Sequence, residues 1–187
     1  VAGTGGWRMT YGIDVSKHQG MIDWSKVKTD FAILRAGFGR YTSQKDPQFE
    51  RNYAGAKAAG IPVGAYWYSY ARSAEEAREE AKACLQVLHG KQFEFPIYFD
   101  IEDSTQGNLG KAVLTAMCEA FCDTLEKAGY FAGVYASTYW FTSKLDHARL
   151  AGKYTIWLAD YRAGYNKTLK RDMHQYTSNG HVAGISG

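Results

Sequence analysis

The sequence lacks the segments that mark several large classes of protein. No apolar run approaches the roughly 20 residues that a transmembrane helix needs, so we expect no membrane insertion. Lysine and arginine form no block beyond the pair Lys170 and Arg171, and the formal net charge is only +3. Nucleic-acid binding therefore has no support, although a mild positive charge would tolerate an anionic polymer.

Cysteine is scarce, and its spacing is not that of a zinc site. The chain has three cysteines, Cys84, Cys118 and Cys122, with no Cys-x-x-Cys or Cys/His pattern. Cys118 and Cys122 are four residues apart in a helix-like stretch, where disulfide geometry is poor. Cys84 could pair with one of them if two helices pack together, but buried free thiols are the favoured interpretation.

Common nucleotide-binding and catalytic motifs are also missing. Gly37 and Gly39 begin a Gly-x-Gly-x-x-Gly pattern whose third glycine is absent, and there is no phosphate-binding Gly-x-x-x-x-Gly-Lys-Ser/Thr. Neither the Gly-x-Ser-x-Gly of serine hydrolases nor the His-Glu-x-x-His of zinc proteases occurs. The chemistry must therefore be sought among other residues.

A length of 187 residues suits one domain with a sizeable core. Residues 1–10 (VAGTGGWRMT) lack the apolar stretch of a signal peptide, so we interpret them as a linker or a processed N-terminus. We expect residues 11–187 to form a single catalytic domain. No internal repeat or low-complexity segment divides it.

Strand-like and helix-like segments alternate along most of the chain. Predicted strands cover residues 11–15, 31–38, 62–70, 96–102, 131–137, 154–161 and 173–177, with predicted helices at 47–59, 73–90 and 109–128. This alternation predicts a parallel α/β sheet, either doubly wound or closed into a barrel. Strands with few helices near the C-terminus favour a barrel with an incomplete helical ring.

Two acids end the most apolar of these strands. In Phe-Asp-Ile-Glu-Asp, the alternation of a strand places Asp100 and Glu102 on one face and Phe99 and Ile101 on the other. The carboxyl ends of barrel strands form active sites, and two adjacent acids raise one another's pKa, which suits a general acid. Asp14 lies near the carboxyl end of the first strand and could join this cluster.

Such a cluster has two possible uses. Carboxylates could bind Mg²⁺ or Ca²⁺, or two of them could cleave a glycosidic bond. Tyrosine and tryptophan are abundant, with 14 and five residues, and flat rings with polar edges suit sugars. The aromatic candidates for a sugar groove are Tyr66, Tyr68, Tyr135 and Trp157, although some of these rings must pack the barrel. The abundance of aromatic residues favours cleavage of a glycosidic bond over metal binding.

Seven segments, in order, resemble a known family. They are GIDVSKHQG, DFAILRAGFG, GIPVGAYWYSYA, FPIYFDIED, GVYAS, WLADY and HQYTSNG. Together they closely resemble glycoside hydrolase family 25, the lysozymes that include phage endolysins and bacterial autolysins. The resemblance covers nearly the whole chain from Tyr11 onward.

The resemblance implies a modified TIM-like barrel of eight strands and about five helices. It implies cleavage of the β-1,4 bond between N-acetylmuramic acid and N-acetylglucosamine in bacterial peptidoglycan, outside the cell or in its wall, without a metal or other cofactor. It places the catalytic acid on Glu102, its partner on Asp100 and a third acid on Asp14. Substrate contacts fall on Tyr66, Tyr68, Tyr135, Trp157 and Gln175. We expect a monomer.

The resemblance has one gap. Family members usually carry a further strand with an Asn-Val-Asp-like segment after the glycine-rich end, and the sequence given ends at Gly187 without it. Two alternatives to a muramidase therefore stay open. One is a cell-wall-binding module without turnover. The other is a metal-dependent hydrolase that uses the same acids as ligands.

Overall fold

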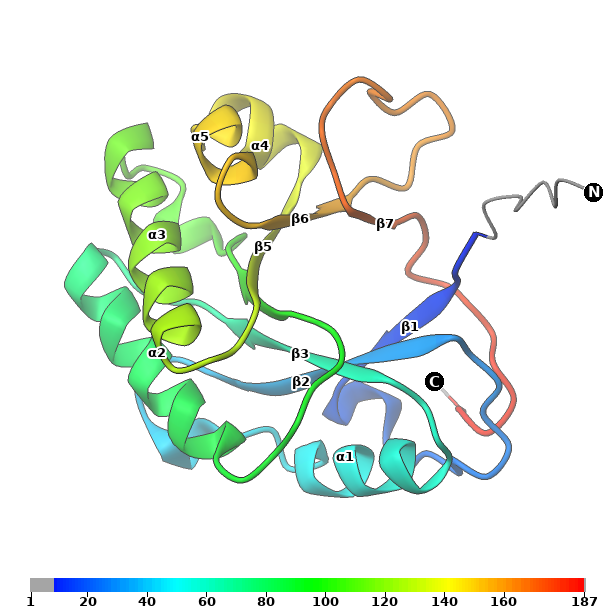
Figure 1. Ribbon diagram of the computed structural model, residues 1–187. Coiled ribbons are helices and arrows are strands. Elements are labelled where there is room, and N and C mark those ends of the chain that lie inside the picture. Colours follow the sequence, from blue (N-terminus) through cyan, green and yellow to red (C-terminus); the bar gives the residue numbers. More distant parts are fainter. Residues whose placement is uncertain (1–8, 187) are drawn as a thin grey trace, which may run out of the picture.

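A computed structural model describes residues 9–186 of the chain. The predicted linker, residues 1–10, falls mostly on residues 1–8, which lie outside the described residues. Seven parallel strands form one curled sheet whose order in space follows their order in sequence (Figure 1). The strands are β1 (Gly12–Val15), β2 (Phe31–Phe38), β3 (Val63–Tyr68), β4 (Ile97–Asp100), β5 (Ala132–Ser137), β6 (Thr155–Ala159) and β7 (Met173–Gln175).

This topology confirms the modified barrel, with one strand fewer than expected. A doubly wound sheet would reverse its strand order near the middle, and this sheet does not. Seven strands are present in residues 9–186 instead of eight. Residues 176–186 follow β7 as irregular chain, because their glycines and small polar residues lack the β-branched run that favours a strand.

Five α-helices accompany the strands in the described residues, as expected. They are α1 (Phe49–Ala58), α2 (Ala74–Leu88), α3 (Lys111–Lys127), α4 (Thr138–Ser143) and α5 (His147–Ala151). The three longer helices pack on the outer face of the sheet, with α2 and α3 side by side (Figure 1). Only two short helices lie between β5 and β6, and the β6–β7 connection has none, so the helical ring is incomplete.

The cap of α2 shows how local sequence fixes a boundary. The Ser73 side chain accepts a hydrogen bond from the backbone N–H of Glu76, as its position predicts. The Glu76 carboxylate accepts from the backbone N–H of Arg72 and not from that of Ser73. Only half of the expected capping box therefore forms.

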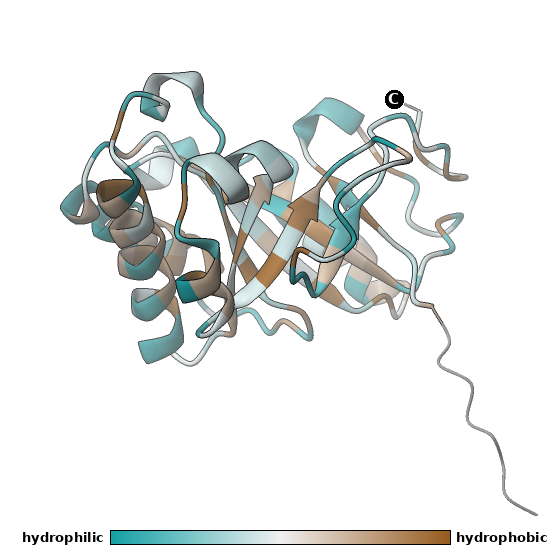
Figure 2. Ribbon diagram, turned by 90° about the horizontal axis from the view of Figure 1, so that it is seen from above, coloured by the Kyte–Doolittle hydropathy of each residue, from teal (hydrophilic) through white to brown (hydrophobic). Residues whose placement is uncertain are grey.

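Two apolar layers lie on opposite faces of the sheet. The outer layer fills the space between strands and helices, and it contains Phe99 and Ile101, as strand alternation predicted. Hydrophobic colours accordingly appear on the strands at the centre, and the helices alternate hydrophobic and hydrophilic ones (Figure 2). The inner layer fills the curled sheet itself and consists of Phe31, Ile33, Tyr98, Tyr135 and Trp157.

The cysteines belong to the outer layer. Cys84 on α2 and Cys118 and Cys122 on α3 are all buried and free, which confirms the favoured interpretation. Burial raises the pKa of the Cys84 thiol well above its ordinary value, so it stays protonated and unreactive at neutral pH.

Glycines make room for the rings of the inner layer. A Cβ added to Gly133 on β5 would lie 2.3 Å from Thr155 Oγ1 and 2.6 Å from Tyr98 Cε1. At Gly64 on β3, it would lie 2.8 Å from Ile33 Cδ1. These contacts are too short for any side chain at the two positions. The Tyr98 ring and the Ile33 side chain therefore require glycine on the neighbouring strands.

We therefore expect Gly133→Ala to destabilise the protein by about 1 to 3 kcal/mol, because overpacking a close-packed interior forces strands or rings apart. Urea unfolding followed by far-ultraviolet circular dichroism measures the change. Gly164→Ala is the matched control, since an added Cβ there meets nothing within 4 Å. Equal unfolding midpoints for the two variants would contradict the packing argument.

Candidate active site

The carboxyl ends of the strands bring the predicted acids together inside the curled sheet. Asp100 is the last residue of β4, and its neighbours in register are Tyr68 on β3 and Tyr135 on β5. Glu102 lies two residues beyond Asp100 at the open mouth and is exposed to solvent. The Asp100 side chain is buried. One acid is therefore at the floor of the site and the other at its entrance.

Asp100 and Glu102 share a hydrogen bond and are electrostatically coupled. Burial raises the pKa of Asp100 well above its ordinary value, and the Glu102 charge and the hydrogen bond to Glu102 raise it further. Partial desolvation also raises the pKa of Glu102, while the hydrogen bond from Asp100 lowers it. Because both pKa values are raised and the two charges repel, ionising both carboxyls together is unfavourable, and burial favours the protonated form most strongly at Asp100.

Asp14 joins the cluster through a hydrogen-bond network centred on Gln175. Gln175 Nε2 donates to Asp14 Oδ2 at 2.9 Å, while the hydroxyls of Tyr135 and Tyr161 donate to Gln175 Oε1 at 2.6 Å and 2.8 Å. Burial raises the pKa of Asp14, and the bond from Gln175 opposes that rise. The amide thereby joins β7 to β1, the two edge strands of the sheet.

The predicted aromatic residues differ in their surroundings. Trp157 is buried and makes edge contacts with Tyr66, Tyr98 and Tyr135, with ring centroids 4.5 to 6.4 Å apart. Its ring therefore packs beneath the site and supports the tyrosines. Tyr66 and Tyr68 are partly exposed on the inner face, and the Tyr68 hydroxyl donates to Asp103 Oδ1 at 3.0 Å.

Among the described residues, no group of three or more His, Cys, Asp or Glu side chains is arranged to hold a metal ion. None of the described helices combines the length and apolar character needed to cross a bilayer.

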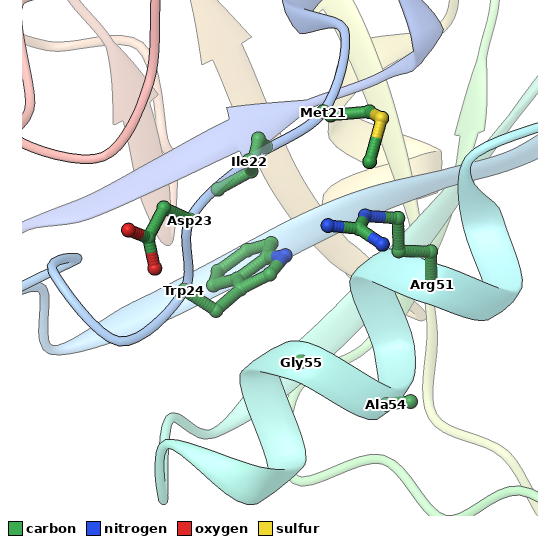
Figure 3. Close-up of a pocket in the computed structure, with 7 residues that line it drawn as sticks. All are labelled: Met21, Ile22, Asp23, Trp24, Arg51, Ala54 and Gly55. Carbon is green, nitrogen blue, oxygen red and sulfur yellow. The ribbon is translucent and has the colours of Figure 1, made fainter.

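A separate hollow lies outside the sheet, between the β1–β2 connection and α1 (Figure 3). Its lining includes Trp24, Arg51 and Asp23. Asp23 is held by Ser25 and Lys26, and no second acid lines the hollow. The acid pair at the mouth of the sheet is therefore the stronger candidate for catalysis.

Comparison with known proteins agrees with this geometry. Residues 13–185 match the model of glycosyl hydrolases family 25. The chain belongs to this family.

Three relatives illustrate the match. An uncharacterized protein, YegX of Escherichia coli O157:H7, is 30% identical over 95% of this chain and 66% of its own length. Lysozyme M1 of Streptomyces globisporus is 28% identical over 94% of this chain and 64% of its own. The crystal structure of the CTP1L endolysin superimposes with a TM-score of 0.82 at 28% identity, covering 96% of this chain and 64% of that one. The chain thus spans about two thirds of the length of these relatives.

Further residues of this family 25 chain support the site, and the sequence did not single them out. Arg35, Asp103 and Tyr161 contact or polarise the predicted residues. Strand alternation alone could have indicated Arg35, because it lies two residues after Ile33 on the inner face of β2. Tyr161 and Asp103 lie just beyond strand ends, where alternation no longer fixes a direction.

Glu80 is a buried acid that anchors the segment beyond β3. Ser69 Oγ donates to Glu80 Oε1 at 2.6 Å, and Tyr70 N–H donates to Oε2 at 2.9 Å. Gln106 Nε2 donates to Ser69 Oγ, so the segment after Glu102 is tied to the same carboxylate. Burial raises the pKa of Glu80 to about 7, although these hydrogen bonds oppose the rise.

A pKa raised in the folded state makes stability depend on pH. The contribution of Glu80 is complete below pH 4.5, its ordinary pKa, and is lost as the pH rises through about 7. Relative to Glu80→Gln, the wild-type protein should lose about 3 kcal/mol of unfolding free energy over this window. Urea unfolding at a series of pH values measures it.

Glu75→Gln provides the control, because Glu75 is on the same helix with an exposed carboxylate paired to Arg78. Its stability should follow the wild-type pH dependence. If the wild-type and Glu80→Gln curves ran parallel between pH 4.5 and 8, Glu80 would not titrate in this range.

Proposed function

We propose that this chain is a muramidase that hydrolyses the β-1,4 bond between N-acetylmuramic acid and N-acetylglucosamine in bacterial peptidoglycan. The observation that carries this proposal is the adjacent pair of acids, Asp100 and Glu102, whose pKa values are both raised, at the mouth of a tyrosine-lined curled sheet. Membership of glycosyl hydrolases family 25 supports it, as does the likeness to Lysozyme M1.

Glu102 is the proposed general acid. Its exposed position at the mouth lets it reach the glycosidic oxygen, whereas Asp100 lies deeper. When substrate binds, the shared proton passes from Asp100 to Glu102 and then to the leaving oxygen as the bond to the anomeric carbon breaks. The ionised Asp100 then stabilises the positive charge that develops on the sugar.

The 2-acetamido oxygen of the substrate is the proposed nucleophile. Asp100 and Glu102 come from one strand end, so both approach the sugar from similar directions, and neither is placed to attack opposite the leaving group. Attack by the acetamido oxygen forms a cyclic intermediate whose N–H donates to Asp100. Glu102, now ionised, removes a proton from water, and the resulting attack opens the ring.

The remaining predicted residues bind and orient. Tyr66, Tyr68 and Tyr135 offer ring faces and hydroxyls to the glycan, and Trp157 holds the rings of Tyr66 and Tyr135 from beneath. Asp14 and Gln175 fix the Tyr135 hydroxyl and the local electrostatic potential. We further propose that residues 11–187 act as one catalytic domain, as a monomer, on cell walls outside the cytoplasm.

Two other functions make different predictions. A wall-binding module without turnover would bind purified cell walls but release no soluble fragments. A metal-dependent hydrolase would lose activity in the presence of a chelator. Mass spectrometry of released fragments tests the muramidase directly, because cleavage at this bond leaves N-acetylmuramic acid at the new reducing end.

We expect Glu102→Gln to reduce wall lysis by at least about 100-fold, because general acid catalysis is commonly worth 10² to 10⁴-fold. Asp100→Asn should be similarly severe, since Asp100 faces the developing charge. Asp14→Asn should be milder, because the Asp14 side chain is hydrogen-bonded to Gln175 and acts on the acid pair only through its charge. Release of soluble fragments from labelled cell walls gives the rates.

Circular dichroism and thermal unfolding verify that each of these variants is folded. A folded Glu102→Gln protein with near-normal activity would show that the acid is elsewhere. Equal, small losses for Asp100→Asn and Asp14→Asn would place the site at another part of the sheet.

The proposed double displacement inverts the anomeric carbon twice, so the first product should be the β-anomer. Proton NMR of the anomeric signal, recorded early in the hydrolysis of a defined oligosaccharide and before mutarotation, measures this. An initial α-anomer would indicate direct attack by water and rule out the acetamido nucleophile.

A substrate with a 2-hydroxyl in place of the acetamido group separates the two retaining mechanisms. Acetamido participation predicts loss of nearly all the rate. A nucleophilic Asp100 predicts a much smaller loss and a covalent adduct detectable by mass spectrometry.

A further inference from the structure

Arg35 places a positive charge on the inner face of the sheet without a salt bridge among the described residues. It lies on β2, in register with Tyr66 and two residues after Ile33 of the inner layer. Its guanidinium carbon lies 5.2 Å from the centre of the Phe38 ring and 5.8 Å from that of Tyr68. Two aromatic faces therefore hold the cation in place, and no carboxylate neutralises it directly.

Two buried polar atoms at this level make no hydrogen bond to any described residue. They are Nε of Arg35 and Oδ1 of Asp100. Tyr68 connects the two groups, because its ring lies under the guanidinium and its backbone pairs with Asp100 in the sheet. Arg35 and Asp100 interact through charge, and each keeps a buried polar atom without a hydrogen-bond partner among the described residues.

The charges around the two acids are not equivalent. Asp100 has Arg35 as its positive neighbour, against the negative charges of Glu102 and Asp14. Glu102 has Asp103 and Asp14 as charged neighbours, and both favour its protonated form. The field of Arg35 therefore acts on the deeper acid, and the field of Asp103 acts on the outer one.

We propose that Arg35 is a positioning residue for the catalytic proton, which stabilises the ionised form of Asp100 and so favours transfer of the proton to Glu102. This inference rests on the proposed function, because only a glycosidase of this kind needs the outer acid protonated and the inner one charged. Burial alone favours the opposite arrangement, with the proton on Asp100. A fixed positive charge beside Asp100 opposes that preference without contacting the substrate's leaving group.

Other titratable groups around the pair do not provide this bias. Asp14 on β1 acts on both acids in the same direction, so it does not distinguish them. The tyrosines that face the pair, from β3, β5 and the β6–β7 connection, have pKa values raised by burial and by the acids themselves, and they stay neutral. These are Tyr66, Tyr68, Tyr135 and Tyr161. Asp46, from the segment after β2, acts on Tyr66 and is held by backbone donors.

The test titrates each acid separately, with carbon-13 NMR of labelled side-chain carboxyls. Glu102→Gln isolates Asp100, and Asp100→Asn isolates Glu102. Arg35→Met removes the charge and keeps an apolar side chain against the rings of Phe38 and Tyr68. In the Glu102→Gln background, Arg35→Met should raise the pKa of Asp100 by about one unit. In the Asp100→Asn background, it should leave the pKa of Glu102 within about 0.2 units.

Two controls accompany this titration. Arg35→Lys keeps the charge, so the pKa of Asp100 should stay close to its value in the protein with arginine at this position. Arg78→Met removes an exposed arginine on α2 and should change neither acid. No shift of Asp100 with Arg35→Met, or an equal shift at Glu102, would overturn the proposal. None of these measurements requires turnover, so they remain decisive if the proposed activity itself proves wrong.

With active protein, Arg35→Met should lower kcat about 10-fold with little change in KM, and Arg35→Lys should recover most of it. A rise in KM at constant kcat would instead show that Arg35 binds substrate. If Arg35→Met does not fold, the double variant with Asp100→Asn decides. Restored folding shows that Arg35 balances the charge of Asp100, and a double variant that stays unfolded contradicts the proposal.

Discussion

The hydrogen bond between Asp100 and Glu102 is the interaction on which the site depends. A buried strand rarely ends in two acids on one face, because one charge there is costly and two are more so. The protein reduces this cost through the hydrogen bond between the two carboxyls and by placing the outer acid in contact with solvent. The surrounding arrangement of Asp14, Gln175, Asp103 and the tyrosines is best understood as support for this pair.

Curvature of the sheet makes this support possible. Large side chains fill the inner layer because glycines on neighbouring strands leave room for them, Gly64 for Ile33 and Gly133 for the Tyr98 ring. The rings in turn set the separation of the strands and therefore of their carboxyl ends. Packing in the lower layer thus determines the positions of the polar groups above it.

Strand alternation explains why much of the fold and part of the site could be predicted. The predicted strand at residues 31–38 coincides with β2, and Phe99 and Ile101 lie in the outer layer as expected. Asp100 and Glu102 meet because a two-residue spacing is a local property of the chain. Local patterns also placed the long helices and indicated that the cysteines would be buried as free thiols.

Interactions between distant segments could not be predicted in this way. Gln175 and Asp14 are separated by 161 positions, and only the curl of the sheet brings them together. In the sequence, Glu80 is one of several acids in an amphipathic helix. It is nevertheless buried, because its carboxylate accepts hydrogen bonds from Ser69 and Tyr70 in place of water. The eighth strand was expected from family resemblance and not from a β-rich segment, and no local signal supported it.

The join between β1 and β7 has a consequence for how the molecule comes apart. Every pair of neighbouring strands is held by a ladder of backbone hydrogen bonds, but the two edge strands do not pair, and the Gln175 side chain links them through its hydrogen bond to Asp14. Separating them costs far less than separating any paired strands. The boundary between β1 and β7 is therefore the weakest part of the curled sheet. The first opening under heat or denaturant should begin there, between the earliest and the latest strands of the chain, and should reach the acids before it disturbs the helices.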